Sequence, residues 1–257
     1  MVTSPYSLSY ADLKALPTIV RYHTLECISN EVGGNLMSNA RFTGVSLADL
    51  LNRAGIQHGA SELVFHAADG YSDSLHLSQA LDPRSLVVYL INGAPLPQPH
   101  GYPARLLVPG LYGMKNCKWL TSVELGSGSY TGYWEQQGWT REARVKMTAR
   151  IDVPHDGDLL VARPTYIAGV AYSGDKGIAE VQVSTDSGQT WQPATLRRPL
   201  GPLTWVLWEY AWTPPAGGQY VLAARAIALD GTVQTANSAP PLPDGSSGYD
   251  AISVVTR

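Results

Sequence analysis

The stretch Thr24-Leu25-Glu26-Cys27-Ile28-Ser29-Asn30 carries Cys27, the residue on which the interpretation of fold and function depends. A thiolate suits a soft or high-valent redox metal. No second Cys, His pair or His-Glu-x-x-His motif lies nearby to complete a metal site made only of protein ligands. If Cys27 binds a metal, a non-protein ligand therefore supplies most of the coordination. The plainer interpretation of a lone Cys is a small buried hydrophobe, and both interpretations stay open here.

Two further features surround this thiol. Gly33-Gly34 follows it closely, and glycines would let backbone approach a bulky ligand. Later, His100-Gly101-Tyr102-Pro103-Ala104-Arg105 is followed by Lys115 and Lys118. Arg offers a planar fork and Lys a point charge, which suits a phosphate, although a strand-turn-strand with solvated basic residues fits equally well. We predict surface or satisfied core positions for the remaining histidines, His23, His58, His66, His76 and His155.

Composition excludes several classes of protein. The chain has 257 residues, 44% hydrophobic and 15% charged, so it buries a substantial core. The net charge of -3 and the lack of a basic run argue against nucleic acid as a partner. No apolar stretch approaches the roughly eighteen residues that span a bilayer, and the first sixteen residues do not resemble a signal peptide. Two cysteines cannot form a disulfide framework, although a Cys27–Cys117 disulfide is one option.

The first half of the chain, residues 1–142, is predicted to be α+β. Ser9-Tyr10-Ala11-Asp12 fits a capping box that opens a helix ending before Pro17, and Ser46-Leu47-Ala48-Asp49 opens a second helix that Gly55 ends. Asn92-Gly93 indicates a tight turn. Strands are predicted at residues 62–67, 86–91 and 105–108, and residues 126–141 are predicted to be a connection.

The second half, residues 143–257, is predicted to be all-β. Apolar residues alternate with polar ones over residues 145–151, 179–183 and 220–228, and turn signals separate these runs. This pattern favours a β-sandwich of the immunoglobulin type, without the paired cysteines of antibody domains. Most members of one aromatic set are predicted to fill its core rather than an interface: Trp191, Trp205, Trp208 and Trp212.

The order of short motifs along the chain resembles that of one known family, the sulfite oxidase family of molybdopterin-dependent enzymes. The first half contributes Thr24-Leu-x-Cys27-x-x-Asn30, Gly44-Val45-x-Leu47-x-x-Leu50-Leu51, Asp69-Gly70-Tyr71, Asn92-Gly93-x-Pro95-Leu96-Pro97, His100-Gly-x-Pro-x-Arg105, Val108-Pro-Gly-x-x-Gly113 and Lys118-Trp119-Leu120. In the second half, the run from Val181 to Trp191 and the run from Trp205 to Trp208 are similar to the family's dimerisation domain.

This resemblance implies a cofactor and roles for particular residues. Cys27 would be a catalytic residue and the single protein ligand of molybdenum. The dithiolene of molybdopterin would supply most of the other coordination. The pterin and its phosphate would be held by His100, Arg105, Asn116, Cys117 and Lys118. The resemblance also implies a homodimer and a separate electron-transfer partner, linked to haem or quinone.

The chain departs from sulfite oxidases at positions that contact substrate. Glu31-Val32 stands where those enzymes carry arginines after the cysteine, and Val206 replaces an arginine in the Trp-x-Leu-Trp run. Trp139 aligns with the family's active-site tyrosine, and Tyr130 and Tyr133 are alternatives. The site would lack the arginines that balance the charge of a doubly anionic substrate. A substrate other than sulfite is therefore predicted. The Cys-Ile-Ser-Asn-x-Val-Gly-Gly form resembles a bacterial branch often fused behind membrane-spanning helices.

The leading hypothesis is therefore oxygen-atom transfer on a small, neutral or weakly charged substrate, in a bacterial extracytoplasmic or membrane-associated setting. The family domain normally begins upstream of the helix near Ser7–Leu13, so the chain is expected to be a fragment or to lack part of the site and any membrane anchor. A non-catalytic module for self-association is the alternative hypothesis. A thiol redox protein that uses Cys27 and Cys117 is a third.

Overall fold

The computed structural model describes all residues, 1–257, and they form two compact units. The first unit consists of Met1–Cys27 and Ser38–Arg144, and the second of Ile28–Met37 and Val145–Arg257. The sequence predicted a change of domain between residues 142 and 143, close to this boundary, but did not predict that the segment directly after Cys27 belongs to the second unit.

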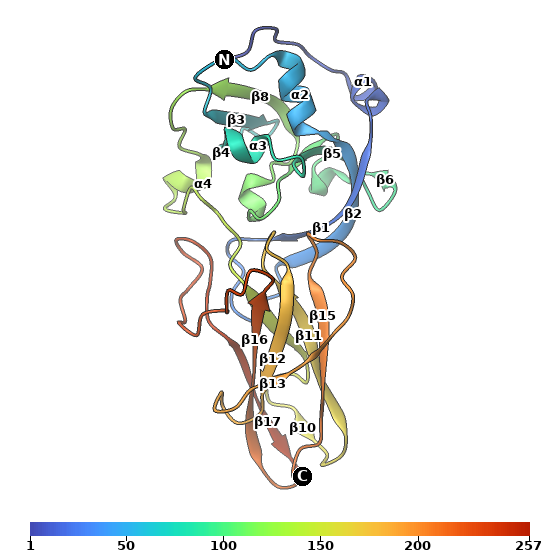
Figure 1. The fold of residues 1–257 in the computed structure, drawn as a ribbon, viewed down its shortest axis with the longest axis vertical. Coiled ribbons are helices and arrows are strands. Elements are labelled where there is room, and N and C mark those ends of the chain that lie inside the picture. The colour runs from blue at the N-terminus through green and yellow to red at the C-terminus, as the bar shows by residue number, and fades with distance from the viewer. The chain divides into compact units, whose positions relative to one another are not determined.

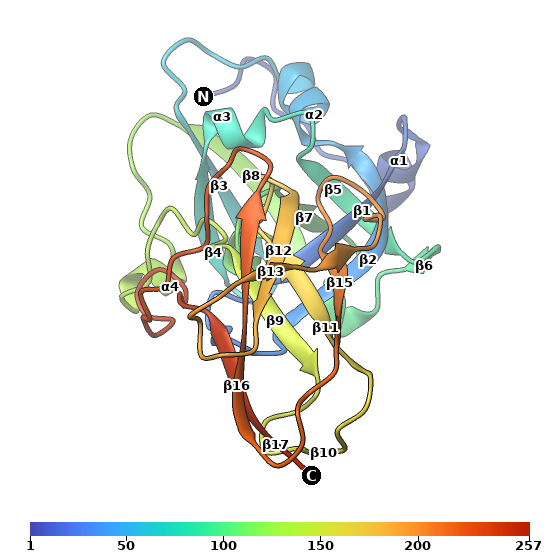
Figure 2. The same cartoon turned by 60° about the horizontal axis from the view of Figure 1, so that its bottom comes forward.

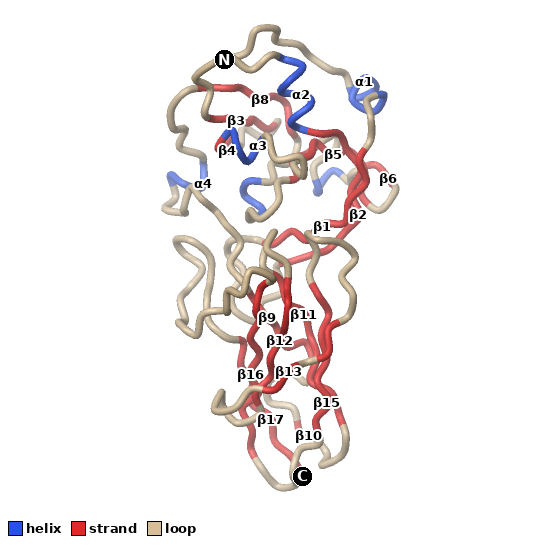
Figure 3. The backbone as a smooth tube through the Cα atoms, in the orientation of Figure 1, coloured by secondary structure: helices blue, strands red, loops and turns tan.

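The first unit combines strands with short helices (Figures 1 and 3). Its helices are α1 (Tyr10–Ala15), α2 (Leu47–Ala54), α3 (Leu77–Ala80), α4 (Tyr133–Gln136) and the 3-10 turns η1 (Gln98–His100) and η2 (Gly113–Lys115). Its strands are β1 (Ile19–Glu26), β2 (Met37–Ser46), β3 (Glu62–Ala67), β4 (Ser72–His76), β5 (Leu86–Ile91), β6 (Ala94–Pro95), β7 (Arg105–Leu107) and β8 (Leu120–Gly126).

Two sheets organise this unit. One has the order β1-β2-β5-β6, with β7 paired to β5, and the other has the order β4-β3-β8. A hydrophobic cluster that includes Leu47, Leu63, Phe65 and Leu106 joins the helices to both sheets. Burial of such side chains contributes about 1.5–3 kcal/mol each, so this cluster is the main source of the unit's stability.

Local signals in the sequence correctly predicted both of the longer helices and one turn. The Ser9 hydroxyl accepts from the amide of Asp12 at 3.2 Å, which caps α1. Ser46 caps α2 in the same way, and α2 ends at Gly55, which has a φ of +74°. Asn92 and Gly93 have φ values of +52° and +87° and connect β5 to β6, as the tight-turn signal indicated.

The strands on either side of Cys27 were not predicted. In β1 the side chains of His23, Thr24 and Glu26 are all buried, so the strand lacks the alternation of apolar and polar residues that marks a half-buried strand. Strands β4 and β8 and the short helices α3 and α4 were missed too. The predicted connection at residues 126–141 contains α4 and belongs to the first unit.

The second unit is all-β, as predicted (Figures 1 and 2). One sheet has the order β10-β17-β16-β12-β13 and the other the order β14-β15-β11-β9. The strands are β9 (Thr148–Val153), β10 (Leu159–Leu160), β11 (Thr165–Tyr172), β12 (Ile178–Ser184), β13 (Gln192–Pro193), β14 (Thr195–Leu196), β15 (Val206–Trp212), β16 (Gln219–Ala228) and β17 (Asp250–Thr256). β12 and β16 match the predicted ranges to within a residue, whereas β9 begins three residues later than expected.

A single hydrophobic cluster draws on both sheets of this unit, so they form a sandwich. Ile167 and Val206 come from one sheet and Val181 and Leu222 from the other. Trp208 and Trp212 belong to this cluster, with exposures of 2% and 9%, whereas Trp191 and Trp205 are half-buried. The predicted core role is therefore confirmed for Trp208 and Trp212, which are two of the four and not most of them. The immunoglobulin type of the sandwich stays a prediction.

Candidate functional site

Cys27 lies at the carboxyl end of β1, directly after the buried Glu26, and its side chain is exposed. The turn η2 packs close to this strand end, because a Cβ added at Gly113 would lie 3.4 Å from the carbonyl oxygen of Glu26. The two segments that the sequence singled out therefore meet. The thiol is not buried in the hydrophobic core, so the plainer interpretation of Cys27 as a small buried hydrophobe is wrong.

Arg105 is the buried cation of this region. It is 7% exposed, and its Nη1 and Nη2 donate to the backbone carbonyls of His100 and Asn116 at 3.1 and 2.9 Å. Neither partner is a carboxylate, and Nε has no partner at all. Burial lowers the pKa of Arg105 to about 10, so the guanidinium is still charged near neutral pH. A buried charge without a counter-ion is costly, which makes this position well suited to an anionic group.

His100 and Lys118 lie next to Arg105 through the packing of Gly101. A Cβ at Gly101 would lie 3.1 Å from both the Cα of Lys118 and the Cβ of Arg105, and Gly101 has a φ of +108°. His100 is exposed and Lys118 half-buried, with Nζ of Lys118 donating to the carbonyl of Pro99 at 3.1 Å. The fold thus gathers three of the predicted cofactor-binding residues, all of them basic, at one place.

Asn116 and Cys117 use their side chains within the fold. The Asn116 side chain accepts from the amide of Val108 at 2.7 Å and donates to the carbonyls of Leu111 and Tyr112 at 3.2 and 3.0 Å. Cys117 is 2% exposed, and burial raises the pKa of its thiol to about 12. Their predicted contacts with the cofactor stay predictions, and these hydrogen bonds show that the Asn116 side chain closes the loop between β7 and η2.

Gly33 and Gly34 are packed against other atoms of the protein, and their predicted approach to a ligand stays a prediction. A Cβ at Gly33 would lie 2.6 Å from Oδ1 of Asp250, and one at Gly34 would clash with the side chain of Asn30. The atoms that approach these glycines come from the side chains of Asp250 and Asn30 and from the backbone of Glu31, all within the second unit. Their small size is therefore required by packing of the 28–37 segment.

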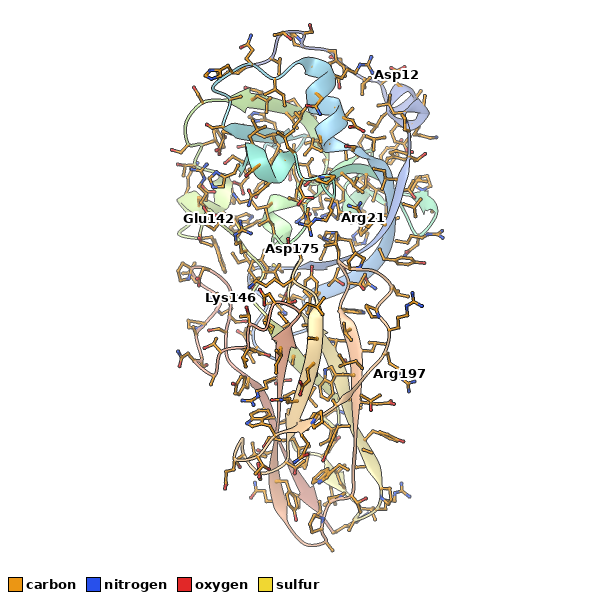
Figure 4. The ribbon with its side chains drawn as sticks, in the orientation of Figure 1. Asp12, Arg21, Glu142, Lys146, Asp175 and Arg197 are labelled. Carbon is orange, nitrogen blue, oxygen red and sulfur yellow. The ribbon has the colours of Figure 1, made fainter.

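His23 was predicted to be a surface or satisfied core residue, and this is wrong for one of its nitrogens. The ring is 1% exposed, and its Nδ1 has no hydrogen-bond partner. Burial lowers the pKa of His23 to about 3, and the charges of Arg21, Arg105 and Arg84 lower it further. Arg21, labelled in Figure 4, donates to the carbonyl of Arg84 at 2.6 Å. The neutral imidazole of His23 therefore lies near three arginines, Arg21, Arg84 and Arg105.

Lys115 was expected to be a flanking basic residue, solvated or close to the phosphate, and the structure corrects this. It is 1% exposed, and its Nζ donates to Asp73 at 2.6 Å and to Glu135 at 2.9 Å. Tyr71 donates to Oδ2 of Asp73 at 3.1 Å and to the carbonyl of Met114 at 2.8 Å. Nothing in the sequence signalled this network, because its members come from separate segments.

The side chains of this site fit a metal whose ligands come mostly from an organic cofactor. No group of three or more His, Cys, Asp or Glu side chains is placed to hold a metal ion. An exposed thiol and a buried guanidinium with an unpartnered Nε are instead the arrangement expected for a metal with an organic, phosphate-bearing ligand.

Comparison with known proteins agrees with this chemistry. Residues 1–134 match the family model for the oxidoreductase molybdopterin binding domain, and residues 142–232 match that for the Mo-co oxidoreductase dimerisation domain. The chain belongs to the sulfite oxidase family of molybdopterin-dependent oxidoreductases. The resemblance seen in the sequence is thereby confirmed, and the cofactor of this molybdopterin domain is molybdenum with molybdopterin.

Individual relatives place the chain within this family. It is 31% identical to human mitochondrial sulfite oxidase over 257 residues, which covers 82% of this chain and 47% of the relative. It is 32% identical to the uncharacterized oxidoreductase YuiH of Bacillus subtilis, over 54% of this chain and 68% of the relative. The chain thus spans about half the length of the sulfite oxidases that it matches.

A solved structure of similar fold is the sulfane dehydrogenase SoxCD of Paracoccus pantotrophus. The TM-score is 0.79 at 22% sequence identity, over 97% of this chain and 72% of that chain. At this identity the likeness concerns the fold alone. None of the helices in the present structure has the length and apolar character that a membrane-spanning segment requires.

Proposed function

We propose that this protein transfers an oxygen atom to or from a small, neutral or weakly charged substrate at a molybdenum centre that Cys27 ligates. In the oxidising direction, substrate and water give the oxygenated product, two protons and two electrons, and the electrons pass to a separate redox protein. The cofactor, when bound, supplies the two-electron chemistry of the metal. The protein's own residues bind, orient and neutralise it.

Each residue of the site has a distinct part in this proposal. The exposed thiol of Cys27 provides the one protein sulfur. Arg105, which lacks a carboxylate partner, would bind the phosphate of the pterin together with His100 and Lys118. The single observation that carries the proposal is this combination of an accessible thiol with a buried, uncompensated guanidinium in a molybdopterin binding domain.

The charge of the substrate is inferred from positions at which sulfite oxidases have arginines and this chain does not. Glu31 and Val32 follow the cysteine where sulfite oxidases have arginines, and Glu31 is exposed. Val206 is 3% exposed and belongs to the hydrophobic cluster of the second unit. Without cations at these positions a dianion such as sulfite would be poorly held, which favours a neutral or weakly charged substrate.

Two hypotheses from the sequence are less well supported than this one. The non-catalytic module is not favoured, since the molybdopterin binding domain matches over residues 1–134. The thiol redox protein requires Cys117 to react, yet that thiol is buried and its pKa is raised to about 12. The two cysteines form no disulfide in the structure.

Partners and setting belong to the same proposal. The match to a dimerisation domain over residues 142–232 supports a homodimer, which sedimentation velocity at micromolar concentration would test. A separate electron carrier, linked to haem or quinone, would exchange electrons with the metal. The resemblance of the cysteine motif to a bacterial branch favours an extracytoplasmic or membrane-associated location.

The decisive experiment measures molybdenum and released pterin per chain in purified protein. Wild type is expected to contain close to one of each. Cys27→Ser is expected to lose most of its molybdenum while staying folded, because the side chain is exposed. Lys176→Met is the control and should keep its metal, because Lys176 has no part in the proposed site and forms an exposed pair with Asp230 in the second unit. Full molybdenum content in Cys27→Ser would contradict the assignment.

A further inference from the structure

A buried ion network lies directly beside the proposed cofactor site and takes no part in the function described so far. The ammonium of Lys115 is bonded to Oδ1 of Asp73 at 2.6 Å and to Oε1 of Glu135 at 2.9 Å. The side chains of these three residues are 2%, 0% and 8% exposed. Water is therefore almost excluded, and each charge depends on the others.

The network joins three elements that are far apart in the sequence. Asp73 is on β4, Lys115 ends η2, and Glu135 is on α4. The second carboxylate oxygen of Glu135 accepts from the amide of Gly132 at 3.1 Å, which fixes the start of α4. A Cβ at Gly132 would lie within 3.0 Å of Asp73, so α4 is pressed onto β4 with no space for a side chain.

The same turn also contacts segments that carry the residues proposed to bind the metal and the phosphate. Gly113, at its start, lies against the carbonyl of Glu26, the residue before Cys27. Asn116, directly after Lys115, offers its backbone carbonyl to Arg105 at 2.9 Å. A displacement of Lys115 would therefore move the strand end that carries the thiol and the acceptor that orients the guanidinium.

We propose that Lys115, held between Asp73 and Glu135, is a positioning residue that fixes η2 so that Cys27 and Arg105 are ready for the cofactor before it binds. The proposal rests on the proposed function, since it assigns the network to assembly of that site. Only one ammonium balances two buried carboxylates. Without Lys115, the carboxylates of Asp73 and Glu135 would repel each other. The ion pairs that hold β4 and α4 against η2 would also be lost.

The charge of Asp73 depends on its partner in the network. Burial raises the pKa of Asp73, while the ammonium of Lys115 and the hydrogen bonds it gives oppose that shift. Tyr71 donates to the same carboxylate and to the carbonyl of Met114 within η2. The turn is thus held by the hydrogen bond that the Met114 carbonyl accepts from Tyr71 and by those that the Lys115 side chain donates.

The test uses the full chain, purified with and without cofactor from replete and cofactor-deficient hosts. The variants are Glu135→Gln, Lys115→Arg and Lys115→Met, with Lys176→Met as control. The control breaks an exposed pair with Asp230 of 3.0 Å in the second unit. Glu135→Gln retains the pair between Lys115 and Asp73, so it keeps the experiment interpretable if Lys115→Met does not fold.

Two readouts separate positioning from general stability. Amide hydrogen exchange in cofactor-free protein should rise at least tenfold over residues 113–116 in Glu135→Gln, while β3 exchanges as in wild type. The molybdenum and pterin content of Glu135→Gln and Lys115→Met from the replete host should be at least fivefold lower than that of wild type. Lys115→Arg should keep part of the wild-type content, and Lys176→Met should keep all of it.

The proposal is wrong if Glu135→Gln, and Lys115→Met where it folds, keep both exchange and cofactor content at wild-type values. It is also wrong if exchange rises equally over β3 and η2, since that result means a stability effect only. A wild type that never holds molybdenum would instead overturn the proposed function, and the local exchange of η2 would still report on the network.

Discussion

Arg105 donates from Nη2 to the backbone carbonyl of Asn116, 2.9 Å away, and so ties the cation of β7 to the residue that follows η2. Its other amino group is bonded to the carbonyl of His100 at 3.1 Å. The guanidinium is thus oriented by main-chain atoms of two loops before any ligand arrives. Such preorganisation lowers the cost of binding an anion, because neither side chain nor loop has to be ordered at that moment.

Replacing Arg105 should therefore separate cofactor retention from folding. In Arg105→Met we expect cofactor content to fall at least tenfold, because a charge-assisted hydrogen bond to a phosphate contributes about 1.5–3 kcal/mol and a buried charge pair more. The cofactor-free chain should lose less stability than a broken ion pair would cost, since no carboxylate is left unpaired. Molybdenum analysis and thermal unfolding of cofactor-free protein check the two parts.

The control for that change is Arg197→Met, labelled in Figure 4, which removes an exposed arginine paired with Glu209 at 2.8 Å. It should leave cofactor content unchanged, as exposed pairs contribute about 0–1 kcal/mol. Arg105→Lys keeps the charge but loses the planar fork, and we expect an intermediate content. Equal content in all three variants would remove Arg105 from the site.

The two cysteines should differ sharply in reactivity. The nucleophile is the thiolate, and the pKa of about 12 for Cys117 leaves only about one thiolate in ten thousand at pH 8, inside a core that excludes the reagent. Cys27 is exposed. We expect iodoacetamide to modify cofactor-free protein once, at Cys27, with Cys117 reacting only after unfolding. Mass spectrometry of proteolytic fragments identifies the site, and comparable modification at both positions would contradict the structure.

What the sequence predicted well is local. The capping hydrogen bond of Ser9 joins residues three apart, and the turn at Asn92-Gly93 needs only two residues with positive φ, so neighbouring side chains alone specify both. β1 was missed for the opposite reason. Its buried His23 and Glu26 are accommodated by strands and loops that are distant in sequence, and this overrides the usual alternation.

The site divides in the same way. Cys27 and Arg105 were predicted as site residues because they stand in ordered motifs that resemble a family. Lys115 was classed with solvated basic residues, because its partners Asp73 and Glu135 lie 42 and 20 residues away and form no motif with it. The residues next to a lysine in the sequence do not show whether its side chain is buried. Only the packing of β4 and α4 around η2 makes it an internal charge.

His23 should make stability depend on pH in a predictable direction. Its pKa is about 3 in the folded state, chiefly through burial, against about 6.5 unfolded. The unfolded chain therefore takes up the proton first as pH falls, and the folded state loses about 1.4 kcal/mol per pH unit from this group between pH 6.5 and 3. Above pH 6.5 the ring is neutral in both states and contributes no slope.

Urea unfolding of wild type and His23→Gln between pH 4 and 7 checks this expectation. The difference between the two free energies of unfolding should change by about 1.4 kcal/mol per pH unit, because carboxyl groups common to both proteins cancel. NMR titration of the imidazole should show no protonation down to pH 4. A ring that titrates near pH 6 in the folded protein would show that His23 is solvated or paired with an anion.

Gly33 should be intolerant of even a methyl group. It has a φ of +74°, and an added Cβ would lie 2.6 Å from Oδ1 of Asp250, whose other oxygen accepts from the amide of Ile151 at 2.7 Å. Asp250 is 8% exposed and cannot turn away without breaking that bond. Gly231→Ala is the matched control, because Gly231 has a φ of +83° but no atom within 4 Å of the added Cβ. Gly231→Ala should cost about 1 kcal/mol from backbone strain alone, and Gly33→Ala about 1–3 kcal/mol more from the clash. Equal losses of unfolding free energy in the two variants would mean that Asp250 moves freely and does not hold the segment that follows Cys27.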